Sequence, residues 1–173
     1  MPTLTRINRL ILHCSASPNG RDDRAVDIDR WHRERGFRRD PALIQHDNPS
    51  LRCIGYHYVI DVSGVVETGR SEREVGAHCQ GYNAGSLGIC LIGTDRYTAA
   101  QWQSLRDMLL GSRDRPDKPA PAGLLARHGL QPAAVHGHRE FNPHKTCPGF
   151  DVRAFVAGGF EPLPDHLLLR ADP

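Results

Sequence analysis

Runs of apolar residues separated by polar, glycine-bearing stretches predict the strands of this chain. Residues 7–14 (INRLILHC) form an apolar run with β-branched members, typical of a buried strand, and His13 stands at its end. Residues 55–62 (GYHYVIDV) and the following VVETGR, joined by a Ser-Gly turn, predict an antiparallel hairpin. The continuous apolar run at 86–93 (SLGICLIG) is typical of a central strand buried on both faces, and a further strand is expected near 133–136.

A helical period of apolar positions appears in two longer segments. Residues 24–35 predict a helix that Asp22 or Asp23 caps and that Gly36 ends. Residues 99–112 predict a second helix, with Thr98 as its N-cap. Its apolar stripe is expected to comprise Trp102, Leu105, Leu109 and Leu110.

The stretches between these elements are rich in polar residues, proline and glycine. Residues 38–54 predict a long irregular loop, which we expect to help shape a binding groove. Residues 71–85 predict a polar loop, and 113–121 (RDRPDKPAP) predict a link that breaks secondary structure. Short helices are expected before His128 and in DVRAFVAGGF.

Strands that alternate with helices predict an α/β fold, with a central mixed sheet flanked by helices. We expect one domain over residues 1–160 and a C-terminal tail at 161–173, because a chain of 173 residues suits a single domain. Charged residues make up 24% and hydrophobic residues 39%, as in ordinary water-soluble proteins. The net charge of +2 is too small for a nucleic-acid-binding surface, so no nucleic-acid partner is expected.

The chain has no apolar run near the ~20 residues that a membrane span needs, so no membrane insertion is expected. The apolar part of its N-terminus, 10–12, is too short for a secretory signal. We therefore expect synthesis in the cytoplasm without a signal peptide.

Cysteine and histidine carry the candidate chemistry. Five irregularly spaced cysteines do not predict a disulfide framework. His138 and Cys147, nine positions apart in one Gly/Pro-rich loop, offer an imidazole and a thiolate, which together suit zinc. A catalytic ion needs three ligands and an open position, and His13 at a strand end is the best third candidate. His136 and His144 compete with His138 for its role.

Six motifs follow one another in a familiar order: LILHCSAS, RWHRERGF, GYHYVI, VVETGR, VGAHCQGYNAGSLGICLIG and GHREFNPHKTCPGFD. Over residues 7–155 the chain resembles the zinc-dependent N-acetylmuramoyl-L-alanine amidases, which include phage endolysin amidases and peptidoglycan recognition proteins. The resemblance implies an amidase/peptidoglycan-recognition-protein-like fold. It also implies cleavage of the bond between N-acetylmuramic acid and L-alanine in peptidoglycan.

The resemblance implies a role for five residues. His13, His138 and Cys147 correspond to the zinc ligands of the family. Tyr56 corresponds to the tyrosine that hydrogen-bonds the water on the metal, and Lys145 to a lysine two positions before the cysteine. A zinc ion lowers the pKa of its water towards ~7 and polarises the amide carbonyl. Tyr56 would orient that water, and Lys145 would place positive charge where the oxyanion develops.

Two features depart from the relatives. The loop from histidine to cysteine is one residue longer, with Pro143 and His144 ahead of Lys145, which affects the exact placement of Lys145. Cys90 stands where some cytoplasmic recycling amidases carry a glutamate base in GIELEG. A buried thiol is a poor general base, so the departure favours the mechanism with Tyr56 and Lys145.

Other polar residues have less specific expectations. His78 is expected in the groove, where it either contacts substrate or supports its loop, and Asn83 is a second candidate for substrate binding. His57 is expected as a core histidine, and His32 as packed or exposed. Two further residues have structural interpretations, Ser86 in the turn after Asn83 and Glu67 as an acceptor.

Two other classes of protein remain open. A peptidoglycan-binding module without catalysis would typically lack the cysteine ligand. A structural zinc protein would need a fourth ligand, which His144 or His136 could supply. The expected partner is peptidoglycan or a muropeptide, and we expect a monomer. Some phage amidases of this type also bind phage RNA polymerase, which the sequence does not predict. The chain is interpreted as a phage or prophage endolysin that acts on the wall after the membrane is permeabilised.

Overall fold

Five strands form one mixed sheet in the order β3-β2-β4-β1-β5. The computed structural model describes residues 6–46, 48–112 and 122–169, so the predicted link at 113–121 lies outside the described residues. The strands are β1 (Arg9–Cys14), β2 (Tyr58–Ile60), β3 (Val66–Thr68), β4 (Ser86–Leu91) and β5 (Val135–Gly137).

Four of the strands are parallel, and only β3 runs antiparallel to its neighbour β2. This confirms the predicted α/β domain with a mixed sheet. The strand expected over 55–62 is shorter. The residues before β2 keep strand-like backbone contacts, since Gly69 N–H donates to His57 O and Arg70 N–H donates to Tyr56 O.

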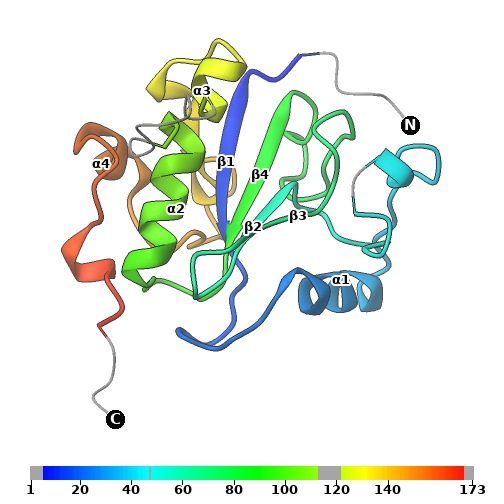
Figure 1. Ribbon diagram of the computed structural model, residues 1–173, viewed down its shortest axis with the longest axis horizontal. Coiled ribbons are helices and arrows are strands. Elements are labelled where there is room, and N and C mark those ends of the chain that lie inside the picture. The colour runs from blue at the N-terminus through cyan, green and yellow to red at the C-terminus, as the bar shows by residue number, and fades with distance from the viewer. Residues whose placement is uncertain (1–5, 47, 113–121, 170–173) are drawn as a thin grey trace, which may run out of the picture.

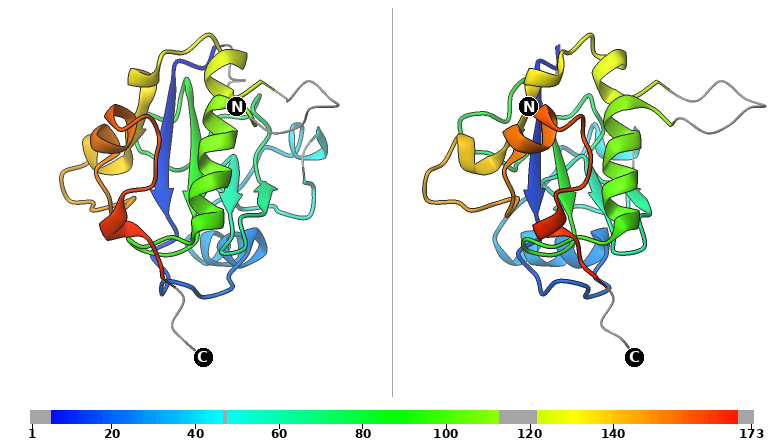
Figure 2. Two further views of the ribbon diagram at one scale, coloured as in Figure 1. Left: turned by 60° about the vertical axis from the view of Figure 1, so that its left-hand side comes forward. Right: turned by 90° about the vertical axis from the view of Figure 1, so that its left-hand side faces the viewer.

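Helices cover both faces of the sheet (Figure 1; Figure 2). On one face lie α2 (Ala99–Leu110), α3 (Leu124–Arg127) and α4 (Val152–Ala157), and on the other lies α1 (Ala25–Glu34). Side chains alternate along β4, so this strand contributes to the hydrophobic core on each face of the sheet. Its first set, Leu87, Ile89 and Leu91, packs in the core under α2, whereas Cys90 and the following Ile92 pack in the core under α1.

The sequence predicts the N-cap of α2 correctly but not the N-cap of α1. Thr98 caps α2 as expected, since its Oγ1 accepts from Gln101 N–H at 3.1 Å. The expectation for α1 is wrong, because its N-cap is Arg24, whose N–H donates to the Asp27 carboxylate at 3.0 Å. Asp23 instead pairs with Arg21. Leu110 is also not part of the buried stripe, being 39% exposed at the last position of α2.

The described part of the C-terminal segment packs along the start of α2. Tyr97 N–H donates to His166 O at 2.9 Å, and Leu168 N–H donates to Tyr97 O at 2.8 Å. The Trp102 indole donates to His166 O at 3.3 Å. Short 3₁₀ turns complete the fold at Ile44–His46, Pro132–Ala134, His138–Glu140 and Pro164–His166. None of the described helices has the length and apolar character to span a membrane.

Candidate metal centre and groove

The parallel register of β1 and β5 brings two histidines together. Leu12 pairs with Gly137, so the residues that follow this pair, His13 in β1 and His138 just after β5, lie at the same edge of the sheet. Their ring centroids lie 4.6 Å apart. His13 follows Leu12, which faces the core under α2, so its side chain points to the opposite face.

The loop after β5 returns Cys147 to this edge. Arg139 N–H donates to Cys147 O at 3.0 Å, which fixes the end of the loop beside its start. Cys14 N–H donates to Cys147 Sγ at 2.9 Å. The ligand atoms of His13, His138 and Cys147 all lie within 4.8 Å of one another, so these three residues could hold a metal ion.

The two competing histidines are not in this group. His136 precedes His138 by two residues on β5, and its Nδ1 lies 3.1 Å from the Glu140 carboxylate. His144 lies on an exposed part of the loop. Histidine, cysteine and acidic residues are the usual metal ligands. Among the described residues of these types, only His13, His138 and Cys147 form a group with metal-ligand spacing.

The environment of His13 fits a metal ligand. Its side chain is 0% exposed, and its Nε2 lies 3.0 Å from His78 Nδ1. Its Nδ1 has no hydrogen-bond partner among the described residues. A buried polar atom without a partner is costly, and a cation would satisfy it. Burial lowers the pKa of His13 well below its usual value, which keeps a lone pair available.

Tyr56 lies beside this centre. Its ring centroid is 5.0 Å from that of His13, and burial raises the pKa of its phenol well above the usual value. The phenol therefore keeps its proton at neutral pH and can donate a hydrogen bond. Burial also raises the pKa of Cys90, which is 0% exposed, so this thiol is not a general base.

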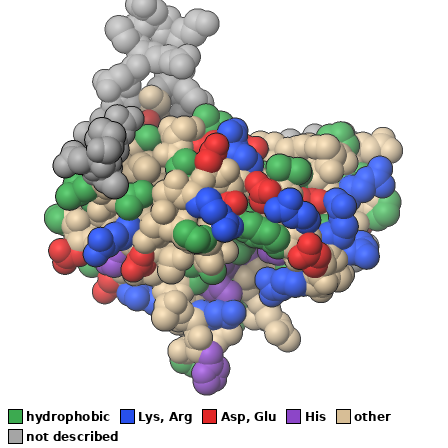
Figure 3. All heavy atoms as spheres, turned by 90° about the horizontal axis from the view of Figure 1, so that it is seen from below, with side chains coloured by type: hydrophobic (Ala, Val, Ile, Leu, Met, Phe, Trp, Pro, Cys, Tyr) green, Lys and Arg blue, Asp and Glu red, His purple; other side chains and the backbone are tan. Residues whose placement is uncertain are grey.

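Two adjoining cavities of about 340 Å³ and 570 Å³ form a groove that starts at the metal centre. They share Arg35, Phe37, His78, His138 and Lys145 in their walls. Seen from below the sheet, histidine side chains lie in the hollow centre of this face (Figure 3). The first cavity also contains Tyr56 and Cys147, and the second contains Asn83 and Asn142.

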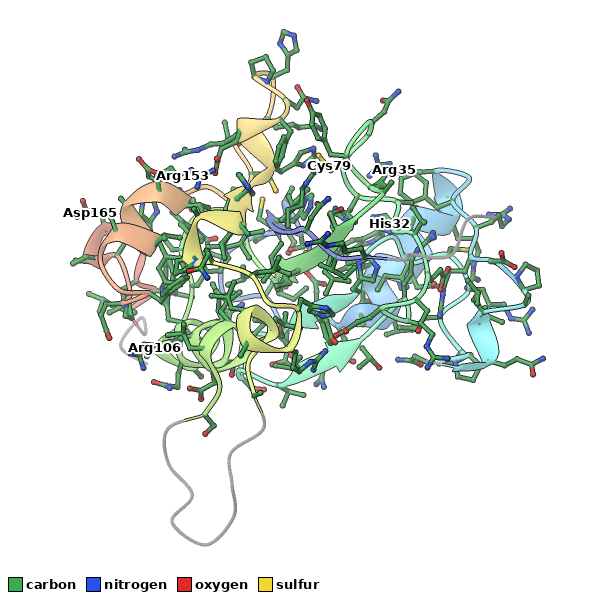
Figure 4. The ribbon with its side chains drawn as sticks, turned by 90° about the horizontal axis from the view of Figure 1, so that it is seen from above. His32, Arg35, Cys79, Arg106, Arg153 and Asp165 are labelled. Carbon is green, nitrogen blue, oxygen red and sulfur yellow. The ribbon has the colours of Figure 1, made fainter. Side chains whose placement is uncertain are left out.

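Arg35 and Phe37 are groove residues that the sequence did not single out. They follow the last turn of α1, and Arg35 lies on the same side of the molecule as Cys79 of the 71–85 loop (Figure 4). The motif RWHRERGF contains both, but its charges resemble an ordinary solvated helix end. The described part of the 38–54 loop does not line the groove; its residues line a separate cavity of about 370 Å³.

The remaining polar residues hold the frame of the groove. Asn83 Oδ1 accepts from His78 N–H at 2.9 Å and from Cys79 N–H at 2.8 Å, which shapes the loop. His57 is a core histidine as expected, with Nδ1 accepting from Gly88 N–H at 3.0 Å. Two other acceptors tie α1 in place, His32 Nδ1 for Gly55 N–H at 2.9 Å and Glu67 for Ala25 N–H at 3.1 Å.

The family model described as N-acetylmuramoyl-L-alanine amidase matches residues 3–150 of the chain. The chain belongs to the N-acetylmuramoyl-L-alanine amidase family. The endolysin of Escherichia phage T7 is 33% identical over 152 residues, which cover 83% of this chain and 82% of the phage protein. The predicted family and the amidase activity are thereby confirmed.

Solved structures of an amidase and of peptidoglycan recognition proteins share the fold. The amidase LysC from Clostridium intestinale superposes with a TM-score of 0.63 at 23% identity and covers 91% of both chains. A complex of the peptidoglycan recognition proteins PGRP-LCa and PGRP-LCx with tracheal cytotoxin gives a TM-score of 0.58 at 21% identity. It covers 97% of this chain and 89% of that one.

Proposed function

We propose that this amidase is a zinc enzyme that cleaves the bond between N-acetylmuramic acid and the L-alanine of the stem peptide. The observation that carries the proposal is the convergence of His13, His138 and Cys147 at the head of one groove. Two imidazoles and a thiolate are a donor set that zinc prefers. Three protein ligands leave a fourth position open, as catalysis requires and a closed structural site does not allow.

When bound, zinc would polarise the scissile carbonyl and make hydroxide available near neutral pH. The other roles belong to residues of the chain. The protonated phenol of Tyr56 orients the attacking water through a hydrogen bond. Lys145, which lines both cavities, supplies positive charge where the oxyanion of the tetrahedral intermediate develops.

The groove supports a muropeptide or peptidoglycan as the ligand. The stem peptide carries carboxylates, and Arg35 and Lys145 place positive charge in the shared walls. Phe37 and Phe141 add apolar surface for sugar rings or side chains. The two residues expected to bind substrate, His78 and Asn83, both line the groove. Several of their polar atoms already have hydrogen-bond partners within the protein.

The deciding experiment is digestion of purified peptidoglycan by the zinc-loaded protein, with product masses identifying the cleaved bond. We expect stem peptides that begin with L-alanine. A chelator and the variant Cys147→Ala should each abolish their release, because each removes the ion. Cys53→Ala is the matched control, since Cys53 is a buried thiol that lies away from the groove.

Other outcomes identify the alternatives. Folded, zinc-loaded protein that binds muropeptides without cutting them would be a recognition module. Spectroscopy that finds four protein ligands around the ion would indicate a structural zinc site.

We also propose that the chain works as an endolysin of a phage or prophage, reaching the wall once the membrane is permeabilised. Its similarity over most of the length of a phage endolysin supports this role. Expression in a bacterial host with a membrane-permeabilising protein should lyse the culture, whereas the Cys147→Ala variant should not. Lysis without any permeabilisation would contradict the proposed route to the wall.

A further inference from the structure

A second histidine lies directly behind the candidate ligand His13. His13 Nε2 and His78 Nδ1 are 3.0 Å apart, and the two rings meet edge to face at 83°. The residues are 65 positions apart in the chain, so the pair exists only in the folded protein. His78 thus occupies the place of an outer-shell partner, a residue that holds a ligand rather than the ion.

The backbone makes room for the His78 ring at two glycines. A Cβ atom on Gly76 would lie 2.4 Å from His78 Cδ2, and one on Gly88 would lie 2.6 Å from the same atom. Both distances are far below ordinary van der Waals contact. Any other residue at either position would displace the imidazole, so glycine in β4 allows His78 to reach His13.

Ser86 completes a chain of hydrogen bonds on the far side of His78. Its Oγ is 3.4 Å from His78 Nε2. The same oxygen lies 2.7 Å from Tyr82 O and 3.0 Å from Asn83 O. Ser86 is 0% exposed, so it is not a solvated hydroxyl.

The backbone carbonyl groups that bind Ser86 set the donor and acceptor roles in this series of hydrogen bonds. A carbonyl oxygen can only accept, so the single Ser86 hydroxyl proton is directed at Tyr82 O or Asn83 O. Ser86 Oγ must then accept from His78 Nε2–H. In a neutral imidazole one nitrogen donates and the other accepts, so His78 Nδ1 accepts from His13 Nε2–H. His13 Nδ1 is left without a proton, and it is the same atom that has no partner among the described residues.

We propose that His78, with Ser86, is a positioning residue that fixes the tautomer and orientation of His13, so that Nδ1 is the atom presented to the metal. The proposal rests on the zinc site put forward above. It assigns His78 a role through His13, since both its ring nitrogens are engaged. Without His78, the neutral His13 ring would populate both tautomers and could rotate. Either change would weaken metal binding.

The test compares zinc affinity in the full-length protein, by competition with a chromophoric chelator, for His78→Ala, His78→Asn and Ser86→Ala. Loss of an outer-shell partner typically weakens metal binding about 10- to 100-fold, and we expect this for His78→Ala. His78→Asn can place an oxygen at the δ position and should recover part of the affinity. Ser104→Ala is the matched control, because Ser104 lies on α2, away from His78, and its hydroxyl donates to Gly64 O.

A second measurement reads the tautomer directly. In the metal-free full-length protein, ¹⁵N spectra of the histidine rings should show His13 protonated at Nε2, and Ser86→Ala should mix the two tautomers. Ser86→Ala removes only one hydroxyl, so it keeps the test decisive if His78→Ala does not fold.

Each result bears on one proposal. Unchanged zinc affinity in His78→Ala and Ser86→Ala, or a wild-type His13 protonated at Nδ1, would overturn the positioning role. A wild-type protein that binds no zinc would overturn the zinc proposal, while the tautomer measured without metal would still decide the role of His78.

Discussion

The phenol of Tyr56 keeps its proton at neutral pH, so it can donate a hydrogen bond but does not act as a phenolate base. It lies beside His13 in the wall of the groove, and its burial disfavours the phenolate. Because burial keeps the phenol neutral, its O–H group remains available to donate a hydrogen bond to a reacting oxygen. Its contribution should therefore appear in the chemical step and not in metal binding.

We expect Tyr56→Phe to lower kcat about 10²- to 10⁴-fold, the usual range for a positioned proton donor, with zinc content unchanged. Steady-state kinetics on a soluble muropeptide and metal analysis measure the two effects. Tyr58→Phe is the matched control, because the Tyr58 hydroxyl donates to Glu72 away from the metal centre. Equal kcat values for Tyr56→Phe and wild type would exclude the proposed role.

Single residues differ in how far their sequence context reveals them. His13 ends a strong apolar run, and His138 and Cys147 share a short loop, so local pattern was enough to propose them. Tyr56 and Lys145 needed the family resemblance, because a strand tyrosine and a loop lysine have ordinary solvated interpretations. The contact between His78 and His13 depends on the position of two glycines in space and has no local signal.

At the scale of elements, Thr98 connects α2 to the sheet. Its hydroxyl accepts from Gln101 N–H and donates to Val62 O at 2.8 Å, just beyond β2. One side chain thus caps the helix and fixes its start against the carboxyl ends of the strands.

Thr98→Ala should reduce the free energy of unfolding by about 1 kcal/mol for the lost cap, and by more if Val62 O is left without a donor. Thr98→Ser keeps the hydroxyl and should retain most of the stability. Urea denaturation of the two variants and the wild type measures the difference. A loss as large in Thr98→Ser as in Thr98→Ala would show that the methyl group, not the hydrogen bonds, is responsible.

Helix starts show where local chemistry suffices and where it fails. The pattern of Thr98 followed three residues later by Gln101 is a capping box, and it predicts α2 correctly. Before α1 several polar residues compete, and the neighbouring Arg21 binds Asp23. The backbone then enters the helix at Arg24, which the side chain of Asp27 stabilises from inside. The Glu67 carboxylate, distant in the sequence, also accepts from Ala25 N–H and from the Arg24 side chain at this helix start, and no local pattern shows those contacts.

At the scale of the whole molecule, buried neutral histidines make stability depend on pH. His57 is 0% exposed between Glu74 O and Gly88 N–H, and burial lowers its pKa to about 4. In an unfolded chain a histidine titrates near ~6.5. Between these values the unfolded state binds more protons than the folded state, so acid favours unfolding.

The contribution of His57 to stability is complete above about pH 6.5 and is lost as the pH falls towards about 4. At about 1.4 kcal/mol for each pKa unit, the loss approaches ~3 kcal/mol. Urea denaturation at pH 7, 6 and 5 should show the decline. His57→Gln should be less stable at pH 7 and should decline less with acid. A parallel decline in both proteins would assign the effect to other groups.

The global architecture was the most predictable level. Apolar runs identify the strands, and their alternation with helices requires a layered α/β fold. The order of the strands, with β1 between β4 and β5, comes from long-range packing that no local pattern encodes. The shared edge at which His13 and His138 meet follows from that order.

Gly111 and Ala122 form an isolated antiparallel bridge at the far end of α2 from Thr98. Residues 111 and 122 therefore lie side by side, at the opposite end of the helix from the carboxyl ends of the strands. Because the entropy of closing a loop rises by only ~0.6 kcal/mol for each doubling of its length, this point tolerates added sequence at little cost. A wall-binding module could therefore be inserted at this point. The resulting enzyme would attack a different bacterium, and its metal centre would be unchanged.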